Sequence, residues 1–239
     1  MIARYTRAEM GRIWSDQGRF ERWLEVELAA TDTLAERGVV PREAAARIRE
    51  RARVDPARIL EIEAKVKHDV IAFTLMVGEA IGDSAAARWL HHGLTSNDVV
   101  DTAQALQLRD ASRLIEQGLE RLGEVLEKRA HEFQHTPQIG RTHGIHAEPI
   151  TFGLKIANWY AENRRNIERF KQAARQVAVG KISGAVGNAA HLGTEAEGAI
   201  CRRLGLDVAL VASQVVQRDR HAQYVSTLAI VAATLEKIA

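Results

Sequence analysis

The segment from Ser96 to about His135 contains no proline and constrains the fold more than any other part of the sequence. Proline breaks helix interiors, so its absence allows one continuous helix. A helix of about forty residues would be about 60 Å long at a rise of ~1.5 Å per residue. This is longer than a compact small domain, which predicts a long-helix bundle shared between subunits. The apolar residues are mostly spaced by three, four or their sums, the period of one helix face: Val99, Ala103, Leu106, Leu114, Leu119, Leu122, Leu126, Ala130 and Phe133.

The rest of the chain also has helical signals. Ser15 or Asp16 can cap a helix that ends near Gly38, and Pro41 and the pair Asp55-Pro56 mark further helix starts. A segment at 68–80 is apolar enough to be mostly buried. A second long helix is predicted at 151–179, a short one at 195–204 and a last one at 219–239. The predicted fold class is all-α: a small helical N-terminal domain over residues 1–94, then the first part of a long-helix bundle over 95–239.

Composition excludes several classes of protein. Lys and Arg total 33 and Asp and Glu total 31, which gives a formal charge of +2. The chain therefore lacks the strong positive charge that would predict general nucleic-acid binding. The longest apolar stretch, 228–233, is far shorter than the ~20 residues that span a bilayer. A single cysteine, Cys201, cannot form an internal disulfide, and the polar segment 1–10 does not resemble a signal peptide. We therefore expect a cytoplasmic protein without a membrane span.

The C-terminal helix pattern runs to Ala239 without a glycine, a cap or a polar tail. Natural helices usually end with such signals. This predicts that the chain is the N-terminal part of a longer protein.

The first candidate for chemistry lies at 141–149, between the two long predicted helices. It holds His143, His146 and Glu148 beside Gly144 and Pro149. Histidine exchanges protons near neutral pH, so the segment suits a general acid or base. On residue type alone, the favoured interpretation is a turn whose histidines bond buried backbone groups. A metal site is less favoured, because Gly144 and Pro149 oppose the helix that would align the ligands.

The second candidate is the start of the long helix. Thr95 and Ser96 supply hydroxyl groups beside free backbone N–H groups, which can bind a carboxylate or a phosphate. The common alternative is that either side chain simply caps its own helix. His91 and His92, just upstream, could add donors or could be surface residues.

Three further segments allow more than one interpretation. Lys67-His68-Asp69 could bind an anion, but adjacent helical residues do not face each other, so a solvated helix end is the default. The glycine-rich segment 180–188 lacks a nucleotide-binding pattern and favours a tight crossover. In the segment 214–221, Arg218 and Arg220 could bind an anion, or Asp219 could cap the last helix.

Taken together, the motifs resemble the adenylosuccinate lyase family of the fumarase/aspartase superfamily. They cover the whole chain in that family's order: Arg4-Tyr5, Met10-Gly-Arg-Ile-Trp14, Lys67-His-Asp-Val-Ile-Ala-Phe73, Thr95-Ser-Asn-Asp-Val-Val-Asp-Thr102, Gly140-Arg-Thr-His-Gly-Ile-His-Ala-Glu-Pro149, Lys181-Ile-Ser-Gly-Ala-Val-Gly187 and Gln217-Arg-Asp-Arg-His-Ala222.

The resemblance implies an activity. Members cleave adenylosuccinate to AMP and fumarate, and cleave succinylaminoimidazole carboxamide ribotide earlier in purine synthesis. Both reactions are β-eliminations that need no cofactor or metal. The enzymes are homotetramers with small-molecule substrates, and their sites combine several protomers.

The resemblance also implies roles for particular residues. His143 is the general acid that protonates the leaving nitrogen. The remaining positions are substrate-binding: Arg4, Tyr5, Lys67, His68, Asp69, His91, Thr95, Ser96 and Gln214. Among them, Thr95 and Ser96 match binders of the succinyl carboxylate, and Arg4 and Tyr5 match nucleotide-binding positions.

Some family features differ here. Asn97 replaces a variable hydroxyl residue, Ile145 replaces a common valine, and 188–191 departs from the usual ending. The family's Ser-Ser-x-Met-Pro-x-Lys-x-Asn-Pro loop, which carries the serine thought to be the base, is not in this sequence. We therefore expect this chain alone to be inactive. Two alternatives stay open: another superfamily lyase such as argininosuccinate lyase, and a non-catalytic helical assembly module.

Overall fold

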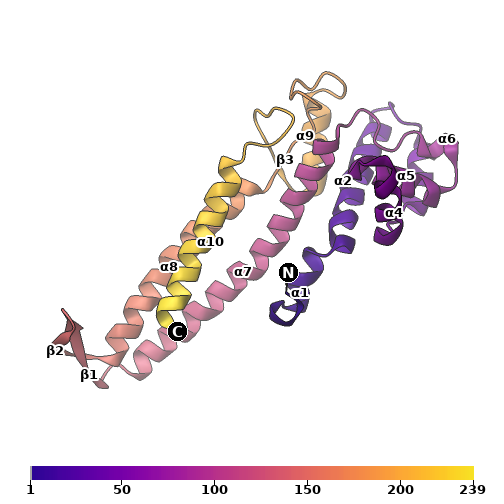
Figure 1. Ribbon diagram of the computed structural model, residues 1–239. Coiled ribbons are helices and arrows are strands. Elements are labelled where there is room, and N and C mark those ends of the chain that lie inside the picture. Colours follow the sequence, from indigo (N-terminus) through magenta and orange to yellow (C-terminus); the bar gives the residue numbers. More distant parts are fainter. Residues whose placement is uncertain (1) are drawn as a thin grey trace. The chain divides into compact units, whose positions relative to one another are not determined.

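The computed structural model describes residues 2–239 and is built mainly of α-helices, which confirms the predicted all-α class (Figure 1). The chain forms two compact units. The first comprises the chain up to Ala111 together with Ala178–Gln217, and the second comprises Ser112–Val177 and Arg218–Ala239. These units are defined by the contacts within this chain. The predicted domain boundary near Leu94 stays a prediction.

The first unit is a cluster of mostly short helices whose starts follow the sequence signals. Ser15 Oγ accepts a hydrogen bond from Gly18 N at 3.0 Å, and Asp55 Oδ1 accepts one from Arg58 N at 3.2 Å. Gly38 takes a left-handed φ of +76° just after the helix Asp16–Glu36. The elements are η1 Ala3–Tyr5, α1 Ala8–Ile13, α2 Asp16–Glu36, α3 Arg42–Arg51, α4 Pro56–Val66, α5 Asp69–Ile81, α6 Ser84–Ala87, the first part of α7 Ser96–Glu132, β3 Val179–Gly180, α9 Thr194–Leu204 and β4 Asp207–Val208.

An aromatic cluster forms the centre of this unit's core. The ring of Trp23 meets Phe20 edge-on at 5.2 Å and Phe73 edge-on at 5.4 Å, measured between centroids. Phe20 and Phe73 are fully buried, and burying such a side chain contributes ~1.5–3 kcal/mol. Val99 and Leu106, at the start of α7, are buried in the same core, so this core positions the residues around Thr95.

The glycine-rich segment 180–188 starts at the end of strand β3, and the tight crossover expected there stays a prediction. Strand β3 pairs in parallel with β4, with Val179 opposite Asp207. A Cβ added to Gly180 would lie 2.8 Å from Cys201 Sγ, so a side chain at this position would force the buried Cys201 to shift.

The second unit contains three long helices: α7 Ser96–Glu132 from Ser112 onward, α8 Phe152–Val177 and α10 Asp219–Ile238. Helices α8 and α10 lie side by side (Figure 1). Buried polar side chains link them to each other and to α7. Asn166 Nδ2 donates to Thr234 Oγ1 at 2.7 Å, and Asn163 Nδ2 donates to the Leu119 carbonyl at 2.9 Å.

The connection between α7 and α8 is a β-hairpin, which was not predicted from the sequence. Strands β1 Pro137–Thr142 and β2 Ile145–Thr151 pair antiparallel around the two-residue turn His143-Gly144. Both turn residues have positive φ, +54° and +74°, as a type I′ hairpin turn requires.

The ends of the predicted helices agree with the structure to within a few residues, but one capping interpretation was wrong. Asp219 is the first residue of α10 and does not cap it; the N-cap is Arg218, without a side-chain capping bond. Across residues 2–239, no helix combines the length and the apolar character needed to cross a bilayer.

Candidate active site

The first candidate segment, Thr95-Ser96, stands at the N-terminus of α7. The Thr95 backbone N–H donates to Asp98 Oδ2 at 2.8 Å. This is the backward half of a capping box, in which a side chain in the first turn bonds the residue before the helix. Asp98 Oδ1 also accepts from Gly184 N at 3.1 Å, so one carboxylate holds both the helix start and the glycine-rich segment.

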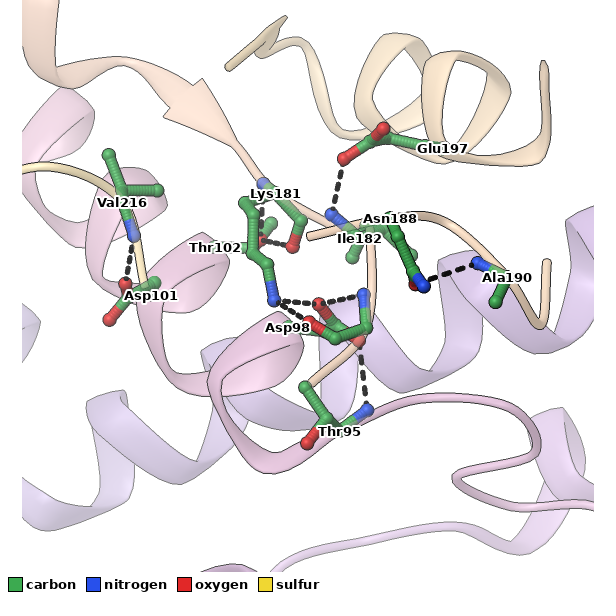
Figure 2. A network of polar contacts seen from close by, with 11 residues as sticks. Thr95, Asp98, Asp101, Thr102, Lys181, Ile182, Asn188, Ala190, Glu197 and Val216 are labelled. Carbon is green, nitrogen blue, oxygen red and sulfur yellow. Dashed lines mark hydrogen bonds and ion pairs between the residues drawn. The ribbon is translucent and has the colours of Figure 1, made fainter. Parts of the chain in front are cut away.

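Asp98 is paired with a buried cation, Lys181. Lys181 Nζ donates to Asp98 Oδ1 at 2.7 Å and to the Gly184 carbonyl, as Figure 2 shows for the pair. Both side chains have zero exposure. The Lys181 backbone is bonded in both directions to Thr102 Oγ1 at 3.0 Å. Buried charges need partners for each polar atom, and this network provides them.

A neighbouring carboxylate completes the network. Glu197 Oε1 accepts from Ile182 N at 2.8 Å (Figure 2). Burial raises the pKa of Glu197, and the negative charge of Asp98 adds to the rise, although the hydrogen bond from Ile182 and the charge of Lys181 oppose it. The segment 181–184 is therefore held at successive positions by acidic side chains from α7 and α9.

A cavity of about 520 Å³ lies beside this network. Thr95 and Gly184 line it, and so do the nitrogen-bearing side chains of Arg37, His92 and His191. Arg37 also pairs with Glu195 at 3.0 Å. A carboxylate entering this cavity would meet cationic or N–H-donating groups on several sides, which suits an anionic substrate.

His91 is held by a carboxylate that was not identified from the sequence. The ring Nδ1 lies 2.5 Å from Glu27 Oε1, and the His91 backbone N–H donates to Glu27 Oε2 at 2.8 Å. Burial lowers the pKa of His91, but the hydrogen bond to Glu27 and the charges of Glu27 and Asp98 outweigh this, so the net shift is upward.

The Lys67-His68-Asp69 segment forms the corner between α4 and α5. Lys67 has a left-handed φ of +56° and ends α4, while His68 is the N-cap of α5 and its Nδ1 accepts from Ile71 N at 3.3 Å. The side chains of His68 and Asp69 are 41% and 47% exposed. The predicted helix-end geometry is therefore present, and the side chains stay accessible to a ligand.

Three other predicted binding residues, Arg4, Tyr5 and Gln214, belong to the first unit. Tyr5 is 72% exposed, and the Arg4 guanidinium lies over its ring at 4.7 Å from the centroid. Gln214 is exposed in the irregular segment after β4.

His143 belongs to the second unit and occupies the first position of the hairpin turn. It is exposed, as are His146 and Glu148 on β2. A left-handed backbone is uncommon for a non-glycine residue and is often found at functional positions. Within residues 2–239, no group of three or more His, Cys, Asp or Glu side chains has the arrangement of a metal site.

Four residues that shape the site were not predicted from the sequence: Glu27, Asp98, Lys181 and Glu197. Asp98 had a local signal, because its position in the first turn fits a capping box. Its pairing with Lys181 spans 83 positions and has no local sequence signature.

Comparisons with known proteins agree with this fold and these motifs. A family model described as lyase matches residues 3–239. An adenylosuccinate lyase from Staphylococcus saprophyticus is 50% identical over all 239 residues, which cover 55% of that protein. The chain thus spans about half the length of the curated relative that it matches.

Solved structures show the same relationship. A fumarate lyase from Mesorhizobium sp. BNC1 aligns with a TM-score of 0.89 at 31% identity, covering 98% of this chain and 57% of that one. A 3-carboxy-cis,cis-muconate lactonizing enzyme from Pseudomonas putida aligns with a TM-score of 0.90 at 33% identity, covering 99% and 55%.

The long-helix fold, the ordered motifs and the family match together show that this chain belongs to the lyase family. The identity to the Staphylococcus protein confirms the resemblance to adenylosuccinate lyase over the whole chain.

Proposed function

We propose that this chain is the N-terminal part of an adenylosuccinate lyase, which releases fumarate from adenylosuccinate to give AMP and from succinylaminoimidazole carboxamide ribotide. The observation that carries the proposal is the 50% identity over all 239 residues to a protein of that name. The motif positions support it, because the Thr95 segment lies beside a cavity suited to an anion.

The proposed reaction is a β-elimination. A base removes a proton from the carbon next to a carboxylate, and negative charge builds up on that carboxylate. The carbon–nitrogen bond then breaks, its electron pair stays on the nitrogen, and His143 donates a proton there. General acid catalysis of this kind typically contributes ~10²–10⁴-fold to the rate. The exposed position of His143 at the tip of a hairpin suits a group that must reach a bound substrate.

Thr95 and Ser96 would bind the carboxylate on which the charge develops. The first turn of an α-helix has N–H groups without partners inside the helix and a positive partial charge, which together stabilise an anion. The buried pair Asp98–Lys181 holds this helix start in place before substrate arrives. Such preorganised donors act on the transition state without reorganising during the reaction.

The other proposed contacts bind the nucleotide part of the substrate. Arg4 can grip a phosphate with two parallel hydrogen bonds, and Tyr5 lies beside it. Lys67, His68 and His91 add further positive charge or N–H donors. Asp69 and Gln214 complete the proposed set through their polar side chains. These groups would gather positive charge locally although the whole chain carries only +2.

We further propose a homotetramer in the cytoplasm, with each site assembled from several protomers. Apolar side chains exposed on the second unit's long helices support an assembly, among them Val125 at 54%, Leu154 at 59% and Val225 at 63% exposure. The base would come from the serine loop that this sequence does not contain. The lone, buried Cys201 supports a reducing compartment.

The test uses the full-length protein that contains this chain. Release of AMP and fumarate from adenylosuccinate, with no cleavage of argininosuccinate, is the expected result. Cleavage of argininosuccinate alone would favour the other lyase, and no cleavage together with no binding of AMP would favour a non-catalytic assembly module. The 239-residue chain by itself should release no fumarate.

A further inference from the structure

Glu27 is a buried carboxylate on α2 whose two oxygens both bind His91. The side chain has zero exposure. Oε2 accepts from the His91 backbone N–H at 2.8 Å, and Oε1 lies 2.5 Å from the ring Nδ1. A carboxylate out of contact with water is unfavourable unless it is paired. Both oxygens of Glu27 contact His91, so His91 is the partner that makes this burial tolerable.

The backbone of His91 is itself unfavourable. Its φ is +61°, in the left-handed region that residues with a side chain rarely adopt. Such conformations persist where surrounding contacts determine them, and they cluster at functional sites. The bond from the His91 N–H to Glu27 holds this backbone, while the second bond holds the ring. One carboxylate therefore sets both the position and the rotation of the imidazole.

The pairing also determines which ring nitrogen is available. An ionised carboxylate can only accept a hydrogen bond, so this contact assigns the proton to Nδ1 and leaves Nε2 for a ligand. The His91 side chain is 24% exposed, which leaves it accessible. Burial disfavours the cationic form of the ring, in which Nε2 carries a proton, but the hydrogen bond to Glu27 and the charges of Glu27 and Asp98 outweigh burial and raise the pKa.

We propose that Glu27 is a positioning residue that holds the His91 ring as an Nδ1-bonded cation, so that Nε2–H can donate to an anionic group, a phosphate or a carboxylate, of the substrate. Asp98 joins this arrangement to the helix start, because it acts on His91 and also holds Thr95. The assignment of the anion to adenylosuccinate rests on the proposed function, whereas the arrangement of the ring does not.

The test compares Glu27→Gln with Glu36→Gln in the full-length protein. Both residues lie on α2, and Glu36 is exposed. The Glu27→Gln side chain keeps the volume and can still accept from the His91 N–H, but it carries no charge. In ¹⁵N NMR of the imidazole nitrogens, the wild type should show a protonated, hydrogen-bonded Nδ1. Glu27→Gln should lose this signature, and Glu36→Gln should retain it.

The kinetic arm measures KM and kcat for adenylosuccinate. Glu27→Gln should raise KM about tenfold or more, a change worth ~1.4 kcal/mol, and affect kcat less, and Glu27→Asp should recover part of the loss. His91→Asn should raise KM similarly, and adding Glu27→Gln to it should cause little further change, since the two act as one unit. A purely structural role for Glu27 would lower stability without this pattern.

The outcomes separate the two proposals. An unchanged Nδ1 signature in Glu27→Gln, or unchanged KM in an active enzyme, would overturn the role of Glu27. An altered signature in a protein that does not cleave adenylosuccinate would refute the proposed function and uphold the positioning of the ring. If Glu27→Gln does not fold, the same measurements on Glu27→Asp decide, with a weakened Nδ1 bond and a raised KM as the expected result.

Discussion

Lys181 Nζ lies 2.7 Å from Asp98 Oδ1, and neither side chain is exposed to solvent. This buried pair joins the first turn of α7 to the segment after β3. Removing water from two charges is costly, and their attraction balances the cost only when their other polar atoms are bonded as well. Here Asp98 also accepts hydrogen bonds from Thr95 N and Gly184 N. The stability of the buried pair therefore depends on backbone groups of the candidate site.

Breaking this pair should destabilise the first unit strongly. Lys181→Met keeps much of the apolar stem but leaves Asp98 buried without its cation. The free energy of unfolding should fall by about 3–5 kcal/mol, the usual cost of an orphaned buried charge. Urea unfolding measures the change.

The matched control is Lys171→Met. Lys171 pairs with Glu116 and Glu120 at the surface, where solvent weakens the attraction, so this variant should lose far less stability. The double variant Asp98→Leu with Lys181→Met should recover part of the loss. Equal losses for the two single lysine variants would contradict the importance of burial.

Replacing His143 should affect turnover and leave the fold intact. His143→Asn removes the acid but suits the left-handed turn, since asparagine tolerates positive φ. In the full-length enzyme kcat should fall by ~10²–10⁴-fold. The thermal midpoint should stay close to that of the wild type. His146→Asn, on the same hairpin, is the control and should retain activity; near-normal turnover of His143→Asn would refute the role of acid.

Gly187 should tolerate no side chain. It has a φ of +79°, and an added Cβ would lie 1.9 Å from the Ala212 carbonyl oxygen. Gly193 has the same φ of +79° but nothing within 4 Å of its added Cβ. Both alanine variants would carry the strain of a left-handed backbone. The difference between their free energies of unfolding therefore measures the clash with Ala212 alone. Gly187→Ala should cost about 1–3 kcal/mol more in urea unfolding, and equal losses would show that the loop shifts freely.

The raised pKa of His91 predicts a pH-dependent stability. In the unfolded chain this histidine titrates near its ordinary value of 6.5. Because the folded pKa is higher, the ion pair with Glu27 contributes fully below pH 6.5. The contribution is lost as pH rises through the folded pKa. The stability difference between wild type and Glu27→Gln, measured by urea unfolding at several pH values, should therefore shrink as pH rises from 6.5; a constant difference would contradict the shift.

Cys201 should be unreactive in the folded protein. Its side chain is fully buried, and burial, with the charge of Glu197 adding to it, raises its pKa to about 12. Only the thiolate reacts with disulfide reagents, and at pH 8 about one molecule in 10⁴ would carry it. A colorimetric disulfide reagent should therefore label the native chain slowly and the urea-unfolded chain rapidly. Rapid labelling of the native chain would show that the core around α9 opens readily.

Much of the helical fold was predictable because its signals are local. Ser15, Asp55 and Gly38 mark helix ends through bonds and backbone angles within a few residues. The long apolar repeat from Ser96 likewise predicted α7. The hairpin was missed because neither strand has a buried residue, so no buried alternation marks them. His143-Gly144 at its turn was its one local signal.

The candidate site also has a part that the sequence predicted and a part that it did not. Thr95, Ser96, His91 and His143 were named from motifs in the linear sequence, and their roles stay predictions. The carboxylates and the cation that hold the first unit's part of the site were not named. Glu27 and His91 are 64 positions apart, and Asp98 and Lys181 are 83 apart. The helical period does place Glu27 on the buried face of α2, seven residues after Phe20 and four after Trp23, but nothing local shows that His91 is its partner.

The sequence by itself determined the helices, the turn residues and the order of the family motifs, because each depends on neighbours within one or two helical turns. The tertiary structure alone decided which partner each buried charge has. A buried charge is tolerated only opposite a suitable group, and packing brings that group from a distant part of the chain. Lys181 therefore appears in the sequence as one basic residue beside a glycine-rich segment, and in the fold as the partner of Asp98.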